Sequence, residues 1–189
     1  MRGKFVLGVA AAALMLGVAP SSWSQDADQA GDAHTTATLT PGQAVDGQIN
    51  PAGDKDWYRL HVETGQRYAI ALDGVAGADG QTLDPFVTVY AADGTTQLAF
   101  NDDANGSLNA ALSYVPSQTG DVFVEARGYS DDVSGAYHLT VTQSALPPDA
   151  VGNDRNTRAR LQSDTPVASS LDYEGDDDVF RMSTSRGHM

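Results

Sequence analysis

The sequence of 189 residues contains no cysteine. This absence excludes disulfide frameworks, thiolate nucleophiles, and zinc, iron–sulfur or c-type haem sites built on cysteine. Basic residues are also few, with 11 Lys and Arg against 25 Asp and Glu and a formal net charge of −14. A nucleic acid or an anionic membrane surface needs a basic face on its partner, so we expect neither as a partner of this chain.

Motifs of enzyme active sites are missing as well. The sequence has no H-E-x-x-H, G-x-S-x-G or P-loop pattern. His61 and His138 fall on predicted strands, opposite the apolar residues, which indicates a half-exposed sheet face. Serines cluster in predicted turns, and no histidine stands at a defined spacing from them. We therefore expect no catalysis by this chain.

Residues 1–24 are typical of a secretory signal peptide. Arg2 and Lys4 precede an apolar run, and Ser22 and Ser24 supply small residues before a cleavage site. The apolar run is shorter than the about 20 residues that a membrane-spanning helix needs. We expect export to the periplasm or the medium, with no membrane insertion after cleavage.

Residues 25–37 are polar and lack periodicity, which predicts a flexible leader. From residue 38 onward, apolar residues alternate with polar ones in short runs separated by glycine-containing turns. Short strands at this spacing indicate an all-β protein with a jelly-roll-like β-sandwich of about eight strands. The predicted strands are Val45–Ile49, Trp57–Val62, Tyr68–Leu72, Phe86–Tyr90, Leu98–Phe100, Leu112–Tyr114, Val122–Ala126 and Tyr137–Val141.

The chain also repeats itself. Residues 39–60 align without gaps with residues 161–182, at an offset of 122 positions. The segment Gly53–Leu60 matches Gly175–Met182 in its glycine, two aspartates, aromatic residue and arginine. Residues 144–152 contain a Pro-Pro pair and are predicted to be a linker. Residues 153–189 are then the truncated start of a second, partial copy of the sandwich.

These motifs resemble the bacterial pre-peptidase C-terminal (PPC) domain family. The resemblance covers residues 38–143, and the second copy matches only the family's opening. The motifs that carry it are Gly53-Asp54-x-Asp56-Trp57-Tyr58-Arg59-Leu60, Leu83-Asp84-Pro85, Asp93-Gly94, Asn101-Asp102-Asp103, Leu108-Asn109, Thr119-Gly120 and Gly135-x-Tyr137-x-Leu139-x-Val141.

The resemblance implies a jelly-roll sandwich without catalytic residues. Domains of this family typically follow the catalytic domains of secreted peptidases and are thought to assist secretion, folding or substrate attachment. Relatives in clostridial collagenases bind collagen and calcium. In this chain the domain follows the predicted signal peptide directly, which differs from the usual order.

Two acidic loops are candidate calcium sites. In one loop, oxygen-bearing side chains alternate before Gly106, as in the first half of an EF-hand loop; its candidate ligands are Asn101, Asp102, Asp103 and Asn105. In the other loop, Asp54 and Asp56 flank Lys55. Two interpretations stay open for both loops, namely a structural Ca²⁺ ion or turns in which the side chains bond nearby backbone N–H groups.

We therefore predict a secreted, non-catalytic accessory or binding module that calcium stabilises. Its expected partner is an extracellular protein or a polysaccharide, and its role is secretion or attachment to a substrate or surface. Two alternatives remain. The chain could be the N-terminal part of a secreted peptidase or other hydrolase, or a repeat unit of a structural surface protein.

Overall fold

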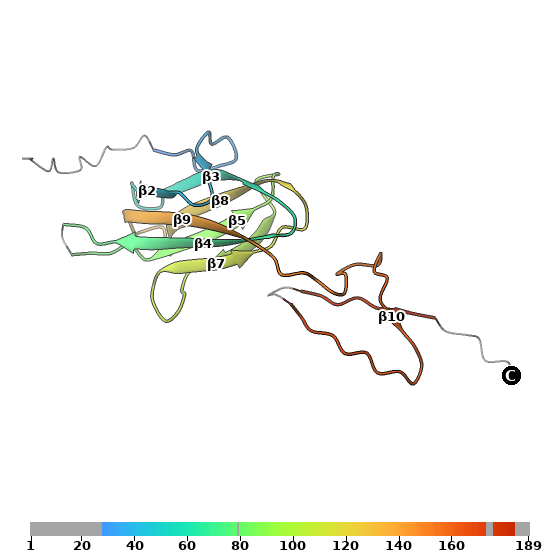
Figure 1. Cartoon of the computed structure of the whole chain (residues 1–189). Coiled ribbons are helices and arrows are strands. Elements are labelled where there is room, and N and C mark those ends of the chain that lie inside the picture. Colours follow the sequence, from blue (N-terminus) through green and yellow to red (C-terminus); the bar gives the residue numbers. More distant parts are fainter. Residues whose placement is uncertain (1–27, 79, 173–175, 184–189) are drawn as a thin grey trace, which may run out of the picture.

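The computed structural model describes residues 28–78, 80–172 and 176–183 (Figure 1). The predicted signal peptide, residues 1–24, lies outside the described residues, as does the end of the chain from residue 184. The described residues form strands and connecting loops. None of them belongs to a helix with the length and apolar character needed to cross a membrane.

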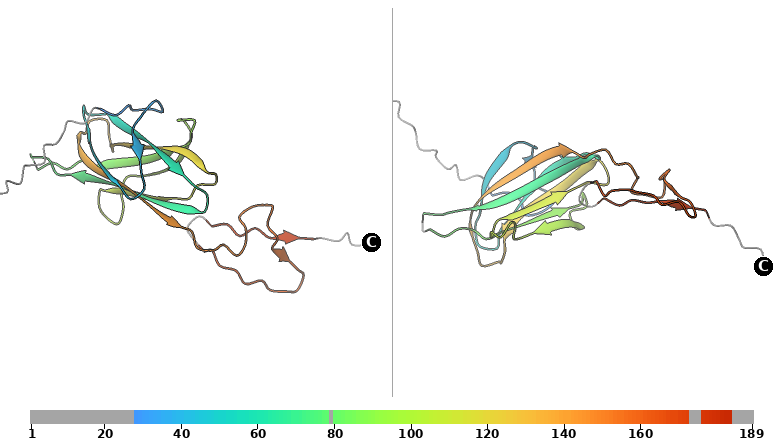
Figure 2. Two further views of the ribbon diagram at one scale, coloured as in Figure 1. Left: turned by 45° about the horizontal axis from the view of Figure 1, so that its top comes forward. Right: turned by 60° about the horizontal axis from the view of Figure 1, so that its bottom comes forward.

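Two sheets face one another across a single core (Figure 2). The five-stranded sheet has the order β1 (Thr38–Leu39), β3 (Lys55–Val62), β8 (Gly120–Gly128), β5 (Pro85–Tyr90) and β6 (Gln97–Asn101). The four-stranded sheet has the order β2 (Ala44–Ile49), β9 (Gly135–Ala145), β4 (Gln66–Val75) and β7 (Ala110–Tyr114). Within these two sheets, pairing is antiparallel except between β1 and β3, which run parallel.

The predicted β-sandwich is confirmed, and each of the eight predicted runs forms one of the strands β2 to β9. The core is built from alternate residues of these strands because successive side chains point to opposite faces of a sheet. Along β3, for example, Tyr58, Leu60 and Val62 are buried while Arg59 and His61 are exposed. His138 is half-exposed, as the strand pattern predicts.

Residues 28–37, which we expected to be a flexible leader, lie against β3 in the structure. Thr35 is only 3% exposed, and its hydroxyl donates a 2.7 Å hydrogen bond to the carbonyl of Trp57. The amide of Trp57 donates to the carbonyl of Ala30, and that of Arg59 donates to the carbonyl of Ala37. This segment therefore adds backbone bonds to one edge of the five-stranded sheet.

Residues 146–172 and 176–183 lie to one side of the sandwich and contain the short strands β10 (Arg160–Leu161) and β11 (Arg181–Met182) (Figure 1). These two strands pair in parallel, with Arg160 opposite Arg181 and Leu161 opposite Met182. The β1–β3 pair has the same register 122 positions earlier, with Thr38 opposite Arg59 and Leu39 opposite Leu60.

Candidate functional site

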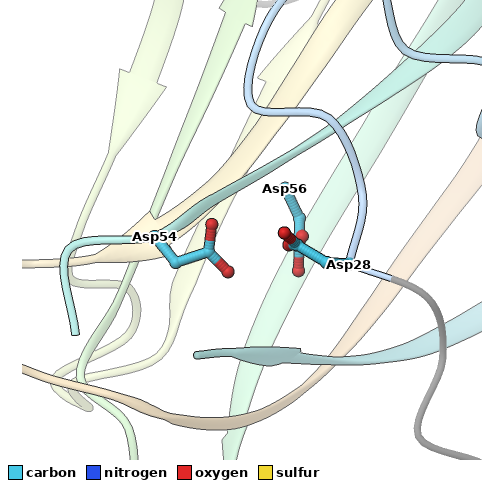
Figure 3. Close-up of side chains that lie close together, drawn as sticks. All are labelled: Asp28, Asp54 and Asp56. Carbon is cyan, nitrogen blue, oxygen red and sulfur yellow. The ribbon is translucent and has the colours of Figure 1, made fainter. Parts of the chain in front are cut away.

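The start of β3 lies beside the N-terminal segment, and three aspartates meet there (Figure 3). Asp54 and Asp56 come from the turn and the strand that follows it, and Asp28 comes from the segment that packs on β3. One carboxylate oxygen of each lies within 4.8 Å of the other two. Oxygen atoms at this separation can share one Ca²⁺ ion, whose ligands lie about 2.3–2.6 Å from the metal.

Asp56 is the buried member of this cluster. It is 2% exposed, whereas Asp28 is exposed and Asp54 is half-buried. Burial raises the pKa of Asp56 to about 6; the hydrogen bond from Tyr137 opposes this change, and the negative charges of Asp54 and Asp28 add to it. The carboxylate form of Asp56 is therefore costly in the folded protein unless a cation compensates it.

The hydrogen bond to Asp56 is part of a buried chain of hydroxyls. The Tyr137 hydroxyl donates to Oδ2 of Asp56 at 2.5 Å and lies 2.6 Å from the hydroxyl of Tyr58. Burial, before any other cause, also raises the pKa of Tyr137. Gly47 makes this arrangement possible, because a Cβ atom there would lie 2.2 Å from the Tyr137 ring.

The other predicted ligands lie at the end of β6 and in the turn that leads to β7. The amide oxygen of Asn101 accepts from the N–H of Ala111 at 3.1 Å, and Oδ1 of Asp102 accepts from the N–H of Asp103 at 3.0 Å. Asn105 adopts a φ of 55°, a left-handed conformation that asparagine tolerates. In the described part of the chain, neither Asp102 nor Asp103 belongs to a metal-competent group of three His, Asp or Glu side chains.

The two predicted loops do not share one site. Asp56 lies opposite Ala126, Ala126 lies opposite Val87, and Val87 lies opposite Asn101. These residues form one row across four neighbouring strands, so Asp56 and Asn101 are separated by three strand spacings, or about 14 Å.

Sequence reasoning missed one member of the first cluster and all of a second one. Asp28 was not singled out because only the fold brings it to β3. The second cluster consists of Asp149, Asp172 and Asp176, whose carboxylate oxygens also lie within 4.8 Å of one another. The repeat offered a signal for it, because Asp176 stands 122 positions after Asp54.

A buried glutamate organises the outer face of the five-stranded sheet. Glu125 is 2% exposed and accepts a 2.9 Å hydrogen bond from Nε1 of Trp57. Its other oxygen lies 3.3 Å from Nε of Arg127 and accepts from Thr88. The guanidinium of Arg127 stands over the ring of Phe86 at 3.8 Å from its centroid. The carboxylate therefore has charged and neutral donors, as a buried charge requires.

An open groove lies along the outer face of the four-stranded sheet, beside β6. We call it the alanine groove, because Ala69, Ala71 and Ala111 line it together with β6 and the turn that follows. Its volume is about 990 Å³. Leu98 and Phe100 also line it, and they are 43% and 58% exposed. The remaining polar lining comes largely from hydroxyl and amide side chains, namely Ser113, Thr140, Thr142, Gln97, Asn101 and Asn105.

The histidines of the described residues each face a carboxylate. The Nδ1 atom of His34 lies 3.0 Å from Oδ1 of Asp32. The Nδ1 atom of His61 lies 2.8 Å from Oδ1 of Asp121, and that of His138 lies 2.5 Å from Oδ1 of Asp46. All three pairs lie on the surface. These contacts orient the imidazole rings of His61 on β3, of His138 on β9 and of His34 in the segment before β1.

No protein-family model matches the chain, and no curated protein is similar to it. Several solved structures are distantly similar. One is the pre-peptidase C-terminal domain of a collagenase from Bacillus anthracis, with 16% identity and a TM-score of 0.45, covering 56% of this chain and 93% of that domain. This is the family that the sequence motifs resemble.

Two further structures match with similar identity, TM-score and coverage. A periplasmic inhibitor of g-type lysozyme from Aeromonas hydrophila is 12% identical, with a TM-score of 0.45, and the match covers 57% of this chain and 95% of the inhibitor. A surface-associated copper-binding protein from Methylomicrobium album is 10% identical, with a TM-score of 0.41 and coverage of 56% and 96%. The sandwich architecture of this chain is therefore assigned from its own strand pairing.

Proposed function

We propose that the chain is an exported, non-catalytic accessory module that binds an extracellular protein or a polysaccharide through the alanine groove. The observation that carries this proposal is the groove itself. Its floor of small side chains lets an extended ligand approach the sheet closely, and Leu98 offers exposed apolar surface at its side. Export is supported by the signal-like pattern of residues 1–24.

Filling the groove tests this function. The probes are collagen, peptidoglycan and an acidic and a neutral polysaccharide, each immobilised and offered to the chain. Ala71→Trp places a large ring in the groove and should reduce binding at least tenfold. Ala78→Trp is the matched control, because Ala78 is exposed in the loop after β4 and does not line the groove.

The result that would refute the groove as the binding surface is equal binding by Ala71→Trp and the unaltered chain. Thermal unfolding of both variants checks that the sandwich is intact. A reduction in both tryptophan variants would point to a general effect of the added ring rather than to the groove.

We further propose that Ca²⁺ stabilises the module at Asp28, Asp54 and Asp56. The support is the mutual approach of three carboxylates and the burial of one of them, Asp56, to which no cationic side chain of the described residues is bonded. Ca²⁺ that binds only the folded chain must raise its stability by mass action. The same melting temperature in chelator and in millimolar calcium would refute this part of the proposal.

A second candidate function is a repeat unit of a structural surface protein. The recurrence of the β1–β3 register in β10–β11 favours it. It predicts further copies at intervals of about 120 residues, since long repeats stack as similar units. The intact mass of the native protein in the cell envelope and medium distinguishes this candidate from a module that acts alone.

A further inference from the structure

The loop between β6 and β7 contains the pattern Asn-x-Ser. Asn105, Gly106 and Ser107 form it, and no other asparagine of the sequence is followed two positions later by serine or threonine. Asn-x-Ser or Asn-x-Thr, with any middle residue but proline, is the acceptor sequence for N-linked glycosylation. The pattern is short, so it becomes a site only where the fold exposes its asparagine.

The fold places this pattern at the tip of a tight turn. The N–H of Ser107 donates to the carbonyl of Ala104 at 3.0 Å, and these two residues form an isolated β-bridge. Between them, Asn105 has a φ of 55° and Gly106 has a φ of 76°. Positive φ at both central positions defines a type I′ turn, for which Asn-Gly is a preferred pair.

The surroundings of the turn leave room for a large group. Asn105, Gly106 and Ser107 are all exposed. A Cβ atom built on Gly106 would meet nothing within 4 Å, so the backbone beside Asn105 faces open space. A sugar on the amide nitrogen of Asn105 therefore displaces no packed side chain.

Neighbouring asparagines of the same loop show that the Asn105 side chain is not needed by the fold. The amide oxygen of Asn101 accepts from the N–H of Ala111 at 3.1 Å, and that of Asn109 accepts from the N–H of Gly74 at 3.1 Å. Within the described residues, the side chain of Asn105 makes no such bond. Of these three asparagines, Asn105 alone is free to react without loss of a structural hydrogen bond.

The residues on either side of Asn105 complete the acceptor. The hydroxyl of Ser107 donates to the carbonyl of Ala104 at 2.9 Å and accepts from the N–H of Asn109 at 3.2 Å, both within the exposed loop. Exposed loop tips open locally at low free energy, so an enzyme can engage this hydroxyl without unfolding the sandwich. Asp103 is exposed and stands two positions before Asn105, where one class of asparagine-linked transferases requires an acidic residue.

We propose that Asn105 is the acceptor of an N-linked oligosaccharide. In the reaction Nδ2 of Asn105 loses a proton and bonds to the anomeric carbon of the oligosaccharide. The bond from that carbon to a lipid-linked pyrophosphate breaks, and the lipid pyrophosphate leaves. Transferases of this kind act outside the cytoplasm, so the proposal rests on the export that is part of the proposed function.

A glycan at this position has a physical consequence for the surface. N-linked glycans are bulky and solubilising. Leu108, three residues after Asn105, is 61% exposed, and Asn105 itself lines the alanine groove. The glycan therefore shields an exposed apolar side chain and stands at one end of the groove.

The acceptor is tested on the purified full chain. It is incubated with a transferase of the class that requires the acidic residue and with a lipid-linked oligosaccharide, and intact mass is measured. We expect the mass to rise by one glycan, and Asn105→Gln and Ser107→Ala to lose the addition. Ser107→Thr is the matched control and should be modified, because threonine keeps the hydroxyl. Asp103→Ala should be modified more slowly.

Thermal unfolding of each variant checks that the sandwich is intact. No addition to the unaltered chain, or an addition that persists in Asn105→Gln, overturns the proposal. This reaction depends neither on export nor on a ligand in the alanine groove, so failure of the proposed function leaves its result unchanged.

The chain recovered from the periplasm or the medium of its source gives the second readout. Mass spectrometry of the peptide that contains residue 105 should show the oligosaccharide on Asn105. An unmodified asparagine there overturns the proposal. An aspartate there, the product of the spontaneous hydrolysis that Asn-Gly pairs undergo, overturns it as well, and its small change in mass distinguishes it from a glycan.

Discussion

The burial of Asp56 predicts an unusual dependence of stability on pH. In the unfolded chain its carboxyl has an ordinary pKa of 3.8, whereas burial raises the pKa to about 6 in the folded protein. A group whose pKa is raised in the folded state stabilises the fold fully at pH values below its pKa in the unfolded chain. That contribution is lost as the pH rises through the folded value. The contribution of Asp56 to the free energy of unfolding is therefore lost as the pH rises from about 4 to about 6.

The size of this loss follows from the pKa difference. A difference of about two units corresponds to about 3 kcal/mol between low and neutral pH, because each unit is worth about 1.4 kcal/mol. Asp56→Asn removes the titration while keeping an oxygen that can accept from the Tyr137 hydroxyl. In the presence of chelator, the variant should match the unaltered chain near pH 4 and exceed its stability by about 3 kcal/mol at pH 7.

Urea denaturation of both proteins between pH 4 and pH 7.5 measures this difference directly. Groups that do not interact with Asp56 titrate equally in the two proteins, so they cancel in the comparison. Repeating the series in millimolar calcium should raise the stability of the unaltered chain at pH 7 and leave Asp56→Asn unchanged. A stability difference that stays constant across the pH range would refute the assignment of the raised pKa to a buried, uncompensated carboxyl.

Four further substitutions test packing and a buried charge, and urea denaturation measures the effect of each. Gly47→Ala should destabilise the fold by about 1–3 kcal/mol, because its Cβ would overlap the Tyr137 ring; an unchanged midpoint would show that the ring can move aside. Leu60→Ala should cost about 2–5 kcal/mol, since Leu60 is fully buried. Its counterpart Met182→Ala should cost less than about 0.5 kcal/mol because Met182 is exposed, and equal losses would contradict the described exposure. Glu125→Gln should cost about 1–3 kcal/mol through the loss of the buried charge facing Arg127, whereas a neutral result would mean that Arg127 is stabilised by Phe86 alone.

The sandwich could be predicted because its strands carry their signal locally. Tyr58, Leu60 and Val62 alternate with polar residues, and the two faces of the strand have different environments in the structure. β1 was not predicted, since a strand of two residues has no period to recognise. It pairs with β3 through contacts between residues about 20 positions apart, which a local pattern does not record.

The candidate site was predictable only in part for the same reason. Asp54 and Asp56 stand close in sequence, and their meeting with Asp28 depends on how the preceding segment lies along β3. In the turn after β6, the alternation of Asn101, Asp103 and Asn105 resembles a ligand pattern, and the Asn101 side chain binds the amide of Ala111. The residue type alone does not distinguish an oxygen that holds a turn from one that holds an ion.

The pairing of β3 with β8 has a consequence for how the chain acquires its structure. Asp56 pairs with Ala126, so the partner of β3 is synthesised some 70 residues later. A polypeptide that emerges N-terminus first from a ribosome or a translocation pore cannot close this sheet until β8 has also emerged. Long-range pairing of this kind slows folding, because loop closure must precede the contacts that reward it. The topology thus delays compaction, so most of the emerging chain can still pass through a pore in an extended state.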